Sequence, residues 1–144
     1  MDQQHSLPVP RQEIPALLER HGILPTAQRV EIATMLLARK DHWSADQVLA
    51  RLAEDGAAVS KATVYNTLNL FADKGLIREV IVDPTKIFFD SNTEPHYHFY
   101  DADTGTLADV LNCDLPLAQL PELPAGMSLE RVDVILRIRS NLRQ

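Results

Sequence analysis

Apolar residues recur at helical spacing four times in the first half of the chain, starting near Arg11. Hydroxyl side chains precede the last three of these repeats, where they would cap a helix start, and glycines follow three of the four, where they would end a helix. The predicted caps and stops are Thr26, Ser44, Ser60 and Gly22, Gly56, Gly75. The pattern therefore predicts four helices between residues 11 and 75.

The period of apolar residues changes from 3.6 to 2 after residue 75. "LIREVIV", a turn at "DPTK" and "IFFD" predict a β-hairpin. Short helices followed by a two-stranded ribbon are the outline of a winged helix-turn-helix, in which the last helix before the wing enters the major groove of DNA. A plain α+β domain with no DNA-binding role is the alternative that this pattern leaves open.

Two further stretches of alternating residues follow. "HYHFYDADTGTLADV" predicts a second hairpin, and "SLERVDVILRIRS" predicts a strand with Val132, Val134, Leu136 and Ile138 on one face. A strand with one apolar face needs a partner sheet or a partner subunit. We therefore expect an α+β chain with a winged-helix DNA-binding domain at residues 1–84 and a small α/β dimerisation domain at residues 85–144.

Charge and composition restrict the kinds of partner. The 144 residues carry a formal net charge of -6, and residues 1–84 hold nine Lys and Arg against eleven Asp and Glu. Any DNA binding must use a local basic patch and should weaken steeply with salt. The single cysteine, Cys113, excludes an intrachain disulfide framework and a Cys-rich zinc site. Without a leader-like N-terminus or an apolar run of membrane-spanning length, we expect a soluble cytoplasmic protein with no membrane contact.

The stretch "TEPHYHFY" holds two histidines, His96 and His98, which alternation places on the same side of a strand. Both imidazoles can therefore reach one ion. Asp90 and Asp109 lie nearby in the sequence, and His42 precedes the third predicted helix. Imidazoles with carboxylates suit Fe(II), Mn(II) or Zn(II) better than Ca²⁺ or Mg²⁺. By spacing alone, metal binding and a structural role for the histidines both stay open.

The predicted recognition helix, residues 60–74, begins with residues suited to DNA. Lys61 can neutralise a phosphate, while Thr63 and Tyr65 offer a methyl group and a ring edge to thymine. Asn66 can bind adenine through two hydrogen bonds. The alternatives are core packing for Tyr65 and a solvated helix face for Lys61 and Asn66. A two-fold dimer would present two such helices to a pseudo-palindrome.

"ATVYNTLNLFADKGLI" followed by "FFDSNTEPHYHFY" resembles the ferric uptake regulator family, whose members are dimeric winged-helix repressors that sense metal, peroxide or haem. The resemblance runs from about residue 14 to 138, and "GILPTAQR" and "HWSADQVL" keep the family's order and spacing. It implies a homodimeric transcriptional regulator of iron homeostasis or peroxide stress, not an enzyme, that binds an AT-rich palindrome.

Residue by residue, the resemblance implies a regulatory Fe(II) or Mn(II) site, with zinc as an occupant in vitro, formed by His42, Asp90, His96, His98 and Asp109. It also implies a base contact by Tyr65 and a phosphate or minor-groove contact by Arg29. The aspartates at the metal site resemble the iron response and peroxide-responsive branches, and Asn66 is most similar to the iron response branch. "DADT" stands where most members carry a Cys-x-x-Cys motif, so the family's structural zinc site is excluded here.

Three alternatives accompany this hypothesis. Haem could bind through the histidines, although the chain has no Cys-Pro dipeptide, the haem-regulatory signature of some relatives. A metal-independent winged-helix regulator would use the histidines only structurally. Two histidines and a carboxylate also form the triad of non-haem iron enzymes, but five candidate ligands leave little room for a substrate.

Overall fold

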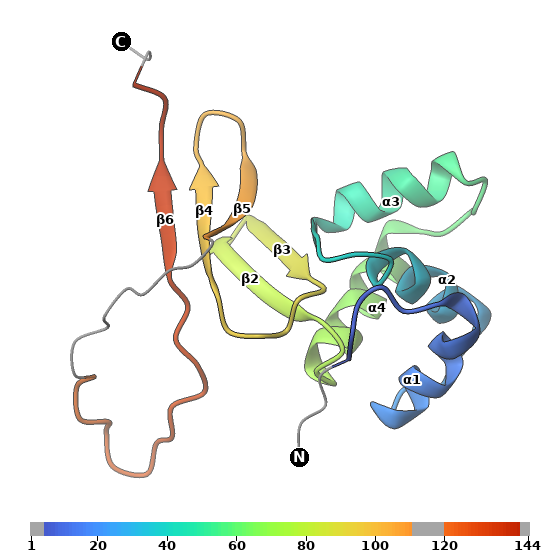
Figure 1. Cartoon of the computed structure of the whole chain (residues 1–144), viewed down its shortest axis with the longest axis horizontal. Coiled ribbons are helices and arrows are strands. Elements are labelled where there is room, and N and C mark those ends of the chain that lie inside the picture. The colour runs from blue at the N-terminus through green and yellow to red at the C-terminus, as the bar shows by residue number, and fades with distance from the viewer. Residues whose placement is uncertain (1–4, 111–119, 142–144) are drawn as a thin grey trace. The chain divides into compact units, whose positions relative to one another are not determined.

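The structure is a computed structural model that describes residues 5–110 and 120–141 (Figure 1). Cys113, which the sequence suggests is a small buried residue, lies outside the described residues. The chain divides into two compact units, Met1–Glu94 and Pro95–Gln144. Within the described ranges, no helix is long and apolar enough to cross a membrane.

The helices of the first unit begin where the sequence predicts. They are η1 (Arg11–Glu13), α1 (Ile14–Arg20), α2 (Ala27–Leu36), α3 (Ala45–Glu54) and α4 (Lys61–Asp73). The side chains of Thr26, Ser44 and Ser60 each accept a hydrogen bond from a backbone N–H in the first turn of α2, α3 and α4. Gly56 and Gly75 follow α3 and α4 with φ of 80° and 78°, a conformation that side-chain-bearing residues rarely adopt. The predicted helices and caps are therefore confirmed.

The first unit has its own hydrophobic core. Each of the four α-helices turns an apolar face inward, and the largest fully buried side chains include Ile14, Leu17, Leu36, Leu52, Leu68 and Phe71. Burying a side chain of this size stabilises the fold by about 1.5–3 kcal/mol. The core holds the helices against a small sheet and so fixes the strands that carry two of the candidate ligands.

That sheet contains the predicted wing. β2 (Arg78–Asp83) and β3 (Lys86–Asp90) form an antiparallel hairpin, and β1 (His42–Trp43) pairs with the other edge of β3. His42 thus lies in a short strand that the sequence analysis treated as a connection. Because β3 pairs with both neighbours, the whole hairpin belongs to the first compact unit, which ends at Glu94.

The described part of the second unit contains a three-stranded sheet. β4 (Tyr97–Asp101) pairs antiparallel with β5 (Thr106–Val110), which confirms the second hairpin, and β6 (Ile135–Ile138) runs parallel to β4. The long strand predicted over residues 128–140 is wrong for its first half. β4 begins at Tyr97 and its ladder with β6 starts at His98 and Ile135, so within the described residues the stretch before Val134 has no strand to pair with.

Candidate metal centre

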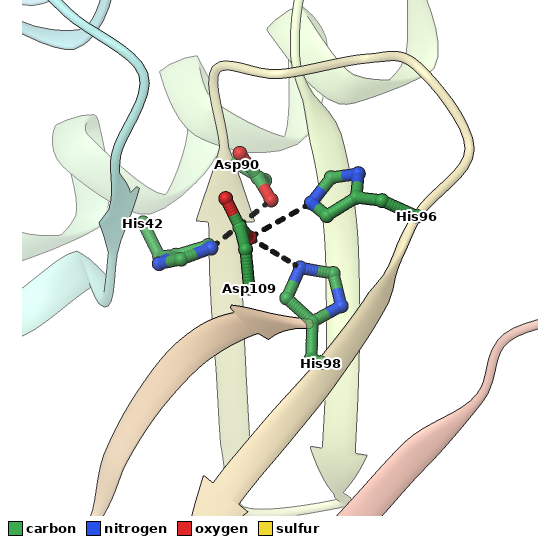
Figure 2. Close-up of side chains that lie close together, drawn as sticks. All are labelled: His42, Asp90, His96, His98 and Asp109. Carbon is green, nitrogen blue, oxygen red and sulfur yellow. Dashed lines mark ion pairs between the residues drawn. The ribbon is translucent and has the colours of Figure 1, made fainter. Parts of the chain in front are cut away.

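His42 and Asp90 form a pair in the first unit, which we call the first half-site. The two residues face each other in the register between β1 and β3. Nε2 of His42 lies 3.3 Å from Oδ2 of Asp90 (Figure 2). The Asp90 side chain is 1% exposed. A buried carboxylate is costly unless a cationic or hydrogen-bonding group faces it, so this position requires a partner such as the His42 imidazole or a metal ion.

The two oxygens of Asp90 have different surroundings. Oδ1 accepts a hydrogen bond of 2.8 Å from the backbone N–H of Asn92, whereas Oδ2 faces His42. The backbone N–H of His42 in turn donates to Oδ1 of Asp41 at 2.8 Å. The backbone around the half-site therefore orients one carboxylate oxygen towards the imidazole, as the outer-shell hydrogen bonds of metal sites do.

His96, His98 and Asp109 form the second half-site, which lies entirely in the second unit. Asp109 in β5 stands directly opposite His98 in β4. Nε2 of His96 and Nε2 of His98 lie 3.0 and 3.5 Å from the same oxygen, Oδ1 of Asp109 (Figure 2). The two imidazole rings are 4.3 Å apart, and His98 is 4% exposed. Both histidines of the quoted stretch thus point to one carboxylate.

The chemistry of the donors fits a borderline divalent ion. Each half-site presents imidazole Nε2 atoms beside carboxylate oxygens. Nitrogen and oxygen donors of this kind are the usual ligands of Fe(II), Mn(II) and Zn(II). Protons compete with such an ion for the imidazole nitrogens, so metal affinity should fall as the pH is lowered.

The start of α4 presents the side chains that the sequence analysis selected for DNA. Lys61 and Asn66 are exposed, and Tyr65 is 39% exposed, which argues against core packing as its role. Thr63 is half-buried, and its hydroxyl lies 2.9 Å from Oγ of the helix cap Ser60. Three of these four side chains are therefore accessible to a partner from solvent.

Lys61 has neighbours of its own at this surface. Its Nζ lies 3.2 Å from Oδ1 of Asp46, in the first turn of α3, and 5.9 Å from the centre of the Tyr65 ring. Both members of the ion pair are well exposed, so the pair is weak, and another anion can replace Asp46 as the partner of Lys61. A phosphate group would be such an anion.

Comparison with known proteins places the chain in a family. The family model described as "Ferric uptake regulator family" matches residues 20–136, which is most of the chain. The chain belongs to the ferric uptake regulator family. The resemblance drawn from the motifs is therefore confirmed.

Several individual proteins of known sequence or structure are similar to this chain. The peroxide-responsive repressor PerR of Staphylococcus aureus is 35% identical over 94 residues, which are 65% of this chain and 64% of the relative, so the match spans less than two thirds of that protein. The ferric uptake regulator of Pseudomonas aeruginosa, solved with manganese, is 26% identical with a TM-score of 0.65 over 89% of this chain and 98% of that one. That of Francisella tularensis, solved with iron, is 21% identical with a TM-score of 0.65, covering 83% and 93%. The α+β fold class is confirmed.

A hollow of about 530 Å³ lies beside α4 in the first unit. Its lining includes Arg29 and Gln28 from the first turn of α2 and Asn66 from α4. Arg29 Nη1 donates to the backbone oxygen of Leu24 at 3.0 Å, which holds the guanidinium near the start of α2. The sequence analysis did not select Gln28 as a lining residue of this surface. Its position beside Arg29 at the start of α2 was the available signal.

Proposed function

We propose that this chain is a homodimeric, metal-responsive transcriptional regulator that binds double-stranded DNA and acts in iron homeostasis or the peroxide response. The observation that carries the proposal is the pair of oriented imidazole–carboxylate half-sites, one in each unit. The names of its relatives agree: one is a peroxide-responsive repressor, and another was solved with manganese.

The two half-sites together would bind one Fe(II) or Mn(II) ion, with zinc as a competitor in vitro. The first half-site offers two ligands and the second offers three, and an ion of this kind takes four or more. Ligands from both units on one ion would tie the unit that carries α4 to the unit that carries the second sheet. The metal would then favour the DNA-binding arrangement by its higher affinity for that arrangement.

The first unit would supply the DNA-binding surface. Lys61 and Arg29 would contact phosphates, while Tyr65 and Asn66, with Thr63 beside them, would contact bases from α4. The accessible side chains on α4 and the hollow beside it support this assignment. An AT-rich palindrome is the proposed operator, because a two-fold dimer places two copies of α4 on two half-sites.

The second unit would supply the dimer interface. Among the described residues of this unit, Tyr100 is the one apolar side chain that is buried. Its exposed large apolar side chains are Leu120, Leu123, Met127, Leu129, Val132 and Ile138. A group of exposed apolar side chains on one small unit is typical of a surface that another chain covers. A second copy of this chain is the proposed partner.

Fluorescence anisotropy on an AT-rich palindromic duplex tests the proposal. Chelator-stripped protein is compared with the same protein plus Mn(II) at one fixed salt concentration, because electrostatic DNA binding depends strongly on salt. We expect tight binding with Mn(II) only, and weak binding to a scrambled duplex of the same composition. Equally tight operator binding without metal would contradict the metal switch and direct attention to haem as the signal.

A further inference from the structure

Ser91 directly follows the candidate ligand Asp90 at the end of β3. It is 3% exposed, and neither the proposed metal ligands nor the proposed DNA contacts include it. The loop at residues 39–41, which leads into the candidate ligand His42, lies against it. Ser91 therefore stands where the two chain segments of the first half-site meet.

The Ser91 hydroxyl joins these segments through the backbone. Its Oγ lies 2.8 Å from the carbonyl oxygen of Arg39, to which it donates, and it accepts a hydrogen bond of 3.0 Å from the N–H of Asp41. The same Oγ lies 3.3 Å from the Asp41 carbonyl oxygen, which also accepts the backbone N–H of Ser91 at 3.1 Å. One buried side chain thus satisfies two backbone groups of the loop.

These hydrogen bonds continue to the ligand itself. The Asp41 carboxylate accepts the backbone N–H of His42, and β1, which carries His42, is only two residues long. So short a strand has few ladder hydrogen bonds to fix its position. The hydrogen bonds of the Ser91 hydroxyl to Arg39 and Asp41 add to these few and hold the segment that leads into β1.

We infer that Ser91 is a positioning residue for the metal site: its hydroxyl holds the His42 segment in register with Asp90 before an ion binds. The inference rests on the proposed function. Without the hydroxyl, the N–H of Asp41 and the carbonyl of Arg39 lose a buried partner, and the imidazole is no longer pre-oriented. Loss of such an outer-shell partner lowers metal affinity by roughly 10- to 100-fold.

The test compares the full-length chain with its Ser91→Ala variant. Isothermal titration with Mn(II) should show roughly 10- to 100-fold weaker binding in the variant. In the metal-free proteins, amide hydrogen exchange at Asp41 and His42 should be faster in the variant. Ser91→Thr, which keeps the oxygen, should restore most of the affinity.

Ser60→Ala is the matched control, because it also removes a hydroxyl that accepts a backbone N–H, that of Thr63, but away from the half-site. It should keep the wild-type Mn(II) affinity. If Ser91→Ala does not fold, Ser91→Cys, with its weaker hydrogen bonds, replaces it in the same titration. Wild-type affinity in a folded Ser91 variant would overturn the positioning role, whereas failure of the wild-type protein to bind Mn(II) would overturn the proposed function first.

Discussion

The two units of this chain differ in how they bury apolar side chains. The first unit encloses a core of fully buried aliphatic and aromatic residues, whereas the described part of the second unit buries Tyr100 and leaves Leu129 50% exposed. The first unit therefore has its own source of stability. The described part of the second unit leaves most of its apolar side chains exposed or half-buried, which agrees with the proposed dimer.

The two half-sites differ in how the chain brings their residues together. His98 and Asp109 face each other across one hairpin, so local pairing is enough to bring them together. His42 and Asp90 come from strands that are distant in the sequence, so their pairing depends on the fold, and we infer that the Ser91 hydrogen bonds contribute to it. The second half-site is thus local, and the first is assembled by the fold.

The largest expected effect comes from a matched pair of leucines. Leu68→Ala, in the core of the first unit, should cost about 2–5 kcal/mol of unfolding free energy, because it removes a fully buried side chain. Leu129→Ala should have a small effect on a dilute monomer, measured by chemical denaturation. A loss at Leu129 that grows with protein concentration would show that a second copy covers it.

His98→Ala should weaken Mn(II) binding by more than the roughly 10- to 100-fold that follows loss of an outer-shell partner, because it removes a proposed ligand. Isothermal titration measures the change. Tyr97→Phe is the control, since alternation along the strand directs Tyr97 to the opposite side. Equal affinity in wild type and His98→Ala would mean that the second half-site binds no metal.

The sequence predicted the elements whose cause is local. Thr26 and Ser60 cap helices with their own side chains, and the i, i+2 spacing of His96, just before β4, and His98, within it, predicted that both point to one side. What it could not predict depends on distant backbone partners. Alternation predicted one apolar face along residues 128–140, but the ladder between β4 and β6 begins only at His98 and Ile135.

The same limit applies to the first half-site. His42 lies in a sheet because β1 pairs with one edge of β3, and no pattern of residues near His42 predicts this pairing. The role of Ser91 depends on a loop fifty positions earlier in the chain. The resemblance to the family supplied the ligand set at these positions, and periodicity alone did not.

If DNA binding belongs to the first unit, changes on α4 should leave the second unit unaffected. Asn66→Ala should cost about 1–3 kcal/mol of operator affinity, confined to the base pair that Asn66 contacts. Competition anisotropy with single-base operator variants measures this, and analytical ultracentrifugation should give an unchanged dimer. An equal loss on every sequence would instead make Asn66 a backbone contact.

The smallest expected effect concerns the ion pair between Lys61 and Asp46. Asp46→Asn should strengthen operator binding a few-fold at low salt, because the exposed carboxylate competes with phosphate for Lys61. The gain should disappear in the Lys61→Met background. A gain that persists without Lys61 would show that Asp46 acts only through the overall charge of the surface.

Mn(II) titration of a double-mutant cycle tests whether both half-sites bind one ion. Wild type, His42→Ala, His98→Ala and the double variant are compared for stoichiometry and affinity. We predict one ion per protomer, a large loss in each single variant, and a loss in the double variant that is not the sum of the two. Unchanged Mn(II) affinity in His42→Ala, with binding left at the second half-site, would contradict the account.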